Sequence, residues 1–79
     1  MDPNNLKKKN VYRTTKVIYP YNISYQIVTG VDVTFVGVCF DESGYRVYIY
    51  MFSFELSQKL PPIIIYLDET QIATLEPVS

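Results

Sequence analysis

The chain contains no histidine and no tryptophan, a single cysteine and only three glycines. Without histidine, a serine or cysteine nucleophile has no side-chain base that titrates near neutral pH. Cys39 alone can form neither an internal disulfide nor a Cys/His zinc site within one chain. Three isolated glycines cannot build a phosphate-cradling loop. We therefore expect a protein that is not an enzyme and that holds no cofactor and no metal ion.

Long hydrophobic runs are also missing. No stretch approaches the ~18 apolar residues of a membrane span, and the first residues lack the apolar segment of a signal peptide. A lone cysteine suits a reducing compartment, although it also allows two copies of the chain to be cross-linked. We expect a cytoplasmic protein without a membrane partner. A chain of 79 residues is one small domain, with a stability of about 4–12 kcal/mol by per-residue scaling.

The net charge of −1 conceals a strong asymmetry along the chain. Residues 17–79 carry seven carboxylates against Arg46 and Lys59, whereas residues 1–16 carry five basic side chains against Asp2 alone. Such segregation is typical either of a basic arm that contacts phosphates or an acidic partner, or of a solvated tail that keeps the chain soluble. The five basic residues are Lys7, Lys8, Lys9, Arg13 and Lys16.

The order of residue types predicts an all-β domain. Residues 1–10 are polar and aperiodic, which predicts a flexible basic arm. From Val11 onward β-branched and aromatic residues dominate, as in strands. We expect one domain over residues 11–79, a small barrel or compact sandwich of five to six antiparallel strands. The expected strands are 11–19, 21–28, the two arms of a hairpin over 31–54, 63–67 and 72–75. Residues 53–60 form either one helical turn or an irregular loop before two prolines.

The hairpin turns at Asp41-Glu42-Ser43-Gly44, which has Asp first and Gly fourth, as in a type I turn. We expect Gly44 to adopt a positive φ, Gly30 to turn the chain into the hairpin, and Gly37 to mark a strand bend or a close backbone approach. If Asp41 faces Tyr45, even-numbered residues share one face of the hairpin and odd-numbered residues the other. A four-residue turn would shift this assignment by one position.

Under that register the even face is an aromatic ladder and the odd face is aliphatic. The ladder holds Tyr48, Tyr50 and Phe52, with Arg46 at its tip. We expect Cys39 to be buried in the aliphatic face as a small hydrophobe. The adjacent carboxylates Asp41/Glu42 and Asp68/Glu69 lie in expected turns, where solvated acidic residues are routine. We therefore assign neither pair to a cation site or to acid–base catalysis.

The second half of the chain resembles an SH3-like small barrel. The resemblance rests on the run Gly30-Val31-Asp32-Val33-Thr34-Phe35-Val36-Gly37-Val38, the Asp-Glu-Ser-Gly hairpin, and residues 63–77. In those last residues a strand, a tight acidic turn at Asp68–Thr70 and a short closing strand follow one another. The likeness covers about residues 30–77 and concerns layout only, with no family-specific binding signature. It implies that binding is a better expectation than catalysis.

Eight tyrosines and four phenylalanines are more than one small barrel encloses, so the rings either cover a thin core or form a binding surface. We expect a module that binds another protein, or a second copy of itself, through an exposed aromatic β-surface. The candidate protein-binding residues are Tyr48, Tyr50, Phe52, Arg46, Tyr19 and Tyr21. The alternative is nucleic-acid binding, with the five N-terminal basic residues on phosphates and tyrosines stacked on bases. The acidic body of the chain disfavours that alternative.

Overall fold

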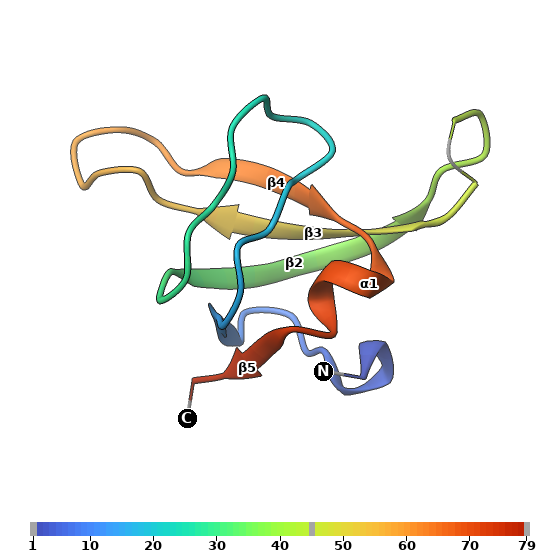
Figure 1. The fold of residues 1–79 in the computed structure, drawn as a ribbon, viewed down its shortest axis with the longest axis horizontal. Helices are drawn as coiled ribbons and strands as arrows, with labels where there is room; N and C mark the ends of the chain where they lie inside the picture. Colours follow the sequence, from blue (N-terminus) through green and yellow to red (C-terminus); the bar gives the residue numbers. More distant parts are fainter. Residues whose placement is uncertain (1, 45, 79) are drawn as a thin grey trace.

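The computed structural model describes residues 2–44 and 46–78. Its fold is all-β, and five antiparallel strands form one open sheet in the order β4-β3-β2-β1-β5 (Figure 1). The elements are the 3₁₀ helix η1 (Pro3–Asn5), β1 (Val11–Thr14), β2 (Asp32–Phe40), β3 (Tyr48–Phe54), β4 (Ile63–Leu67), the helix α1 (Glu69–Ile72) and β5 (Leu75–Pro77). The all-β prediction is confirmed, and β4 has the predicted bounds. Residues 55–62, between β3 and β4, form a loop.

The region predicted as two strands over 11–28 is instead one short strand and a long loop. β1 ends at Thr14, and residues 15–31 hold only one isolated bridge, between Ile18 and Ile27. The buried Thr14 hydroxyl donates to the Val28 carbonyl at 2.8 Å and accepts from the Val31 amide at 2.9 Å. These bonds tie the far end of the loop to the end of β1, so the loop returns to β2 without a continuous strand pair.

The closing strand predicted at 72–75 is present with different bounds, because Glu69–Ile72 form the helix α1 and β5 begins at Leu75. The Asp68 carboxylate caps this helix by accepting from the Gln71 amide at 2.9 Å. A side-chain oxygen at this position satisfies one of the donors that a helix leaves unpaired at its start. Ile72, at the end of the helix, is fully buried. The predicted acidic turn is therefore a helical turn that also adds a side chain to the core.

The hairpin loop is longer than predicted. The Asp41 amide donates to the Val47 carbonyl at 2.9 Å, so the two strands are still paired at these residues. Asp41 Oδ1 accepts from the amides of Ser43 and Gly44 at 3.3 and 3.1 Å, which is the role predicted for it. Gly44 does not adopt the predicted positive φ. Tyr45, the expected partner of Asp41, lies outside the described residues.

The register of β2 against β3 shifts by one residue between Phe35 and Gly37. Phe35 pairs with Phe52, whereas Gly37 pairs with Met51. Val36 therefore has no partner of its own, and the strand contains a β-bulge, which confirms the bend predicted at Gly37. An extra residue reverses the alternation of side chains. Odd-numbered side chains before the bulge thus share a face with even-numbered side chains after it.

This shared face packs inward, so the predicted aromatic ladder is largely core. Tyr50 is 8% exposed and Phe52 is fully buried, and the prediction that both rings face solvent is wrong. The Phe52 ring contacts the ring of Phe35, with centroids 5.3 Å apart, and the ring of Tyr12, edge to face at 6.2 Å. The core also contains Ile18, Ile27, Val33, Ile65, Leu67, Ile72 and Leu75. Loop, helix and sheet thus enclose one face of the middle strands.

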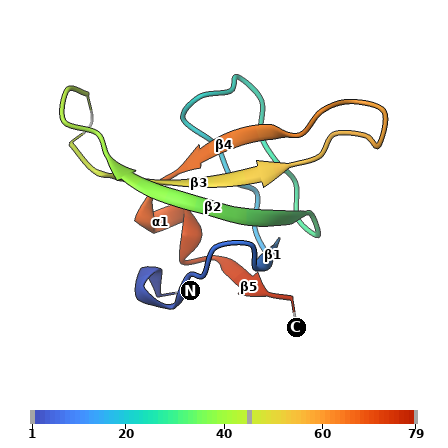
Figure 2. The ribbon, with the colours of Figure 1, turned by 180° about the vertical axis from the view of Figure 1, so that it is seen from behind.

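The free edge of β4 is covered by the long loop, which crosses beside it (Figures 1 and 2). The Asn22 amide group donates to the Ile64 carbonyl at 2.6 Å and accepts from the Tyr66 amide at 2.9 Å. The Tyr21 amide donates to the Tyr66 carbonyl at 2.9 Å. One asparagine side chain therefore supplies hydrogen bonds that a neighbouring strand would supply.

The predicted basic arm lies against the sheet. Leu6 packs on the core, and the Lys7 amide donates to the Tyr12 hydroxyl at 3.1 Å. The Lys9 amide donates to the Phe35 carbonyl at 2.9 Å, next to the last residue pairs of β1 and β2. These contacts place the N-terminal residues beside the first half of β2.

We expect Phe52→Ala to lower the free energy of unfolding by about 3–5 kcal/mol, because it leaves a cavity between two rings of the core. Tyr48→Ala, four positions earlier on the same strand face, removes an exposed ring and should cost less than about 1 kcal/mol. Urea unfolding of the two variants measures the difference. Equal losses would contradict the observed inward direction of this face.

We expect Asn22→Ala to lower the free energy of unfolding by about 1–2 kcal/mol, because it removes both side-chain bonds to β4. Asn22→Asp keeps the acceptor for the Tyr66 amide and loses the donor to Ile64. Amide exchange at Tyr66 should therefore accelerate in Asn22→Ala and stay slow in Asn22→Asp. Asn4→Ala, on the exposed η1, is the matched control and should change neither quantity. Slow exchange at Tyr66 in Asn22→Ala would show that the edge is covered by other groups.

Candidate protein-binding surface

Three adjoining hollows lie where the hairpin tip, the start of α1 and the long loop meet. We call this region the terminal surface. The hollows share lining residues, with Tyr21 common to the first and second, Phe40 to the first and third, and Asp68 to the second and third. Their lining also includes Lys16, Tyr19, Cys39, Asp41, Glu42, Arg46, Tyr48, Ile49, Tyr66, Glu69 and Gln71.

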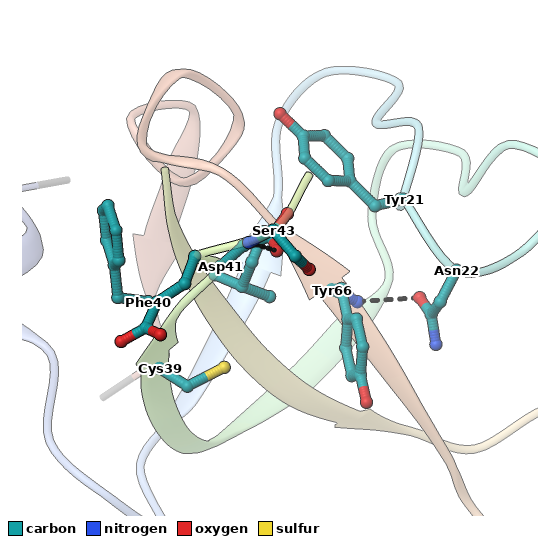
Figure 3. Close-up of a pocket in the computed structure, with 9 residues that line it drawn as sticks. Tyr21, Asn22, Cys39, Phe40, Asp41, Ser43 and Tyr66 are labelled. Carbon is teal, nitrogen blue, oxygen red and sulfur yellow. Dashed lines mark hydrogen bonds between the residues drawn. The ribbon is translucent and has the colours of Figure 1, made fainter. Parts of the chain in front are cut away.

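The first hollow, of about 500 Å³, lies on the outer face of the sheet. The Cys39 thiol and the Tyr66 ring line it, with Tyr21 at its rim, whereas the Phe40 ring points away from them (Figure 3). Ile49, buried at 5% exposure, also lines it. Cys39 is exposed, so the prediction of a buried thiol is wrong. The reason is that Cys39 lies after the bulge, where odd-numbered side chains of β2 point to the outer face and away from the core.

The second hollow, of about 480 Å³, separates the long loop from α1. The Tyr21 hydroxyl donates to Asp68 Oδ2 at 2.6 Å, and the Tyr19 amide donates to Gln71 Oε1 at 2.6 Å. Asp68 therefore bonds to the loop with one oxygen and caps the helix with the other. Lys16 also lines this hollow. These bonds hold the Tyr21 side chain and the Tyr19 backbone in place beside the helix.

The third hollow, of about 360 Å³, lies between the hairpin tip and the start of α1. The rings of Phe40 and Tyr48 pack edge to face across the two strands, with centroids 5.1 Å apart. They remain 46% and 57% exposed, because the hairpin extends beyond the core at this end. Arg46 lines the same hollow and has a φ of 58°, a left-handed conformation that is uncommon for a residue with a side chain.

The structure brings four of the six predicted protein-binding residues to the terminal surface. Tyr19 and Tyr21 come from the long loop, and Arg46 and Tyr48 from the hairpin. Tyr50 and Phe52 lie in the core instead. The sequence reasoning missed Phe40 and Asp68. For Phe40 the available signal was its even number, which puts it on the aromatic face of the hairpin beside the turn. For Asp68 the signal was its place just before a helical turn.

Three of the five basic residues predicted for nucleic-acid binding lie at different places on the molecule. Arg13 Nε lies 2.8 Å from Asp32 Oδ1 on the exposed surface of the sheet. This hydrogen bond raises the pKa of the Arg13 guanidinium and lowers the pKa of the Asp32 carboxyl. Lys8 reaches over Gly37, whereas Lys16 lies at the second hollow. The positive charges are therefore spread over different parts of the molecule.

Other site chemistry can be assessed for residues 2–44 and 46–78. In this part of the chain no three side chains of histidine, cysteine, aspartate or glutamate gather as metal ligands do. No helix within the same residues has the length and apolar character needed to cross a bilayer. Comparisons of the chain with protein-family models, curated proteins and solved structures find no match in any of the three.

Tyr50 should make the stability of the protein pH-dependent at alkaline pH. Burial raises the pKa of its hydroxyl above the usual value of about 10, with smaller contributions from Glu69, Tyr48 and Asp2. The neutral phenol is favoured in the folded chain. The contribution of this hydroxyl to the free energy of unfolding is therefore complete below pH ~10 and is lost as the pH rises through the folded-state pKa. We expect Tyr50→Phe to reduce the loss of stability between pH ~9 and pH ~11, measured by urea unfolding. An unchanged pH dependence in this variant would contradict the assignment.

Proposed function

We propose that this protein is not an enzyme and acts by binding another protein through the terminal surface. The observation that supports this most strongly is the half-exposed edge-to-face pair of Phe40 and Tyr48 beside a hollow. Tyrosine and phenylalanine rings held in place lose little conformational freedom on binding and supply large contact areas. Tyr21, whose hydroxyl is bonded to the cap of α1, and Tyr19, whose backbone is bonded to Gln71, extend the aromatic surface across the same end of the molecule.

The charges around the hollows favour a particular kind of partner. The lining includes four carboxylates, from Asp41, Glu42, Asp68 and Glu69, against the two cations Lys16 and Arg46. Complementary potentials guide association and exclude wrong partners. We therefore propose that the partner presents apolar side chains to the hollows and basic side chains to their rim.

We also propose that the fold is of the SH3-like barrel type. The support is the order of elements in the second half of the chain. A hairpin, the strand β4, one helical turn beginning with an acidic pair and the short strand β5 follow one another. This is the layout on which the resemblance rests. Fold type by itself does not assign a ligand.

Nucleic-acid binding has less support, because its proposed residues are dispersed and Arg13 is already paired with Asp32. The two functions differ in their response to salt. Binding to a nucleic acid weakens steeply as salt rises, roughly in proportion to the number of phosphates neutralised. Contact through aromatic rings depends much less on salt.

The test is capture of partners from the producing cell by the tagged protein, with mass spectrometry and nucleic-acid staining of the bound material. We expect a bound protein whose affinity falls at least about 10-fold in the double variant Phe40→Ser, Tyr48→Ser, since buried aromatic anchors dominate protein interfaces. Both rings are exposed, so this variant should remain folded by circular dichroism.

The matched control is Leu56→Ser with Leu60→Ser. These leucines are similarly exposed, at 52% and 55%, and lie in the loop at the other end of the sheet. The control should bind as well as the unmodified protein. Equal binding by both double variants would contradict the proposed surface. Salt-sensitive capture of nucleic acid without protein would favour the alternative function.

A further inference from the structure

The two outermost strands of the sheet have protected edges. The edge of β4 is bonded to Asn22 and Tyr21. The edge strand β5 is only three residues long and carries Glu76 and Pro77. Short length, charge and proline are the features by which proteins prevent a sheet edge from pairing with another chain.

The second half of β2 is a third edge, and it has none of these protections. β1 pairs with β2 only over Asp32–Thr34, and the N-terminal residues extend this pairing to Phe35. Beyond the bulge, the described residues place no strand beside β2 on the side away from β3. Residues 36–40 contain no proline and no charge.

The backbone groups of Val38 and Phe40 point toward this open side. Asp41 and Val47 form a hydrogen-bonded pair, and such pairs alternate along an antiparallel ladder with pairs that are not hydrogen-bonded. Cys39 and Ile49 are therefore bonded to each other, whereas the N–H and C=O groups of Val38 and Phe40 face away from β3. Their side chains are 50% and 46% exposed.

We propose that two copies of this chain pair antiparallel along this edge, with the two-fold axis at Cys39. This self-association goes beyond the proposed function, because it depends on the backbone groups of the β2 edge, although Cys39, Phe40 and Asp41 also line the first hollow. Val38 of each copy then lies opposite Phe40 of the other, and each such pair exchanges two backbone hydrogen bonds. The same groups serve both copies, as a two-fold interface requires. Val38 and Phe40 side chains also meet across the strands on the inner face.

The same two-fold symmetry brings acidic residues at one end of the edge near a lysine at the other end of the partner's edge. In this register Asp41 of one copy lies opposite Gly37 of the other. The Lys8 side chain reaches over Gly37 on the outer face, with its Cε 3.9 Å from the position that a Cβ there would occupy. Asp41 has the same outer orientation as Cys39, two residues earlier in the alternation. Asp41 Oδ1 keeps its bonds to the Ser43 and Gly44 amides, and in this register its negative charge and that of Glu42 lie on the side of the other copy's Lys8.

Cys39 provides a specific probe of the register. Two residues on the axis form a pair that is not hydrogen-bonded, with Cα atoms about 4.5 Å apart, which lies within the range of disulfides. The thiol is exposed on the outer face. Diamide can oxidise two Cys39 thiols to one disulfide, taking up the two protons and two electrons that the thiols release.

The experiment measures the dimerisation constant of the full chain by sedimentation under reducing conditions, and then the yield of Cys39 disulfide with diamide. We expect a concentration-dependent dimer that cross-links. Val38→Lys places charge on the edge and should weaken dimerisation and cross-linking at least about 10-fold. Val28→Lys is the matched control, since Val28 is 54% exposed in the long loop. This control should dimerise and cross-link like the unmodified chain.

A chain that stays monomeric at every concentration, or equal dimerisation of the Val38→Lys and Val28→Lys variants, would overturn the proposal. A dimer that does not cross-link through Cys39 would overturn the register. Val38→Lys leaves Phe40 and Tyr48 in place, so it should still capture the protein partner. Loss of dimerisation with retained capture separates this proposal from the proposed function. Both valines are exposed, so each variant should keep the urea midpoint of the unmodified chain, which checks that it is folded.

Discussion

The β-bulge at Val36 determines which side chains of the hairpin meet. Phe35 lies before the bulge and pairs with Phe52, while Val38 and Phe40 lie after it and pair with Tyr50 and Tyr48. Without the extra residue, strict alternation would place Phe35 and Val38 on opposite faces of the strand. With it, one face of the hairpin carries apolar side chains along its whole length. The core and the exposed aromatic pair are two ends of that one face.

The molecule covers only part of this face, and the uncovered part is the candidate site. The long loop, α1 and β5 enclose the middle of the sheet, where Phe52 and Leu67 are fully buried. The hairpin continues past this cover toward its tip (Figure 1). Asp68 holds both the helix and the long loop, so the boundary between covered and uncovered residues is fixed by hydrogen bonds. The half-exposed Phe40 and Tyr48 rings therefore lie beside a helix and a loop that are joined by hydrogen bonds.

Much of the fold could be predicted from the sequence, because strand composition and turn residues act locally. The all-β class, the strand Ile63–Leu67, the turn at Gly30 and the backbone bonds of Asp41 followed from residue types alone. The positions that failed depend on distant partners. A bulge is set by the pairing of two strands, and Val36 looks like any strand valine. Tyr48, Tyr50 and Phe52 share one face as predicted, but the shift adds Val33 and Phe35 to that face, which is the buried one.

The candidate site was predicted in part for the same reason. The sequence showed several tyrosines in the first third of the chain and an aromatic hairpin. Their meeting at one end of the sheet depends on Asp68 and Gln71, whose bonds span about fifty residues of the chain. Cover of the β4 edge by Asn22 has no local signature either, since its partners are Ile64 and Tyr66.

The most direct test of this account is the register of β2 against β3 in solution, read from cross-strand contacts between Hα protons in nuclear magnetic resonance spectra. Such contacts are strongest at pairs that are not hydrogen-bonded. The bulged register predicts them at Phe40 with Tyr48, at Val38 with Tyr50 and at Phe35 with Phe52. A contact between Val36 and Phe52, with none from Phe35, would mean a regular ladder and would contradict the account.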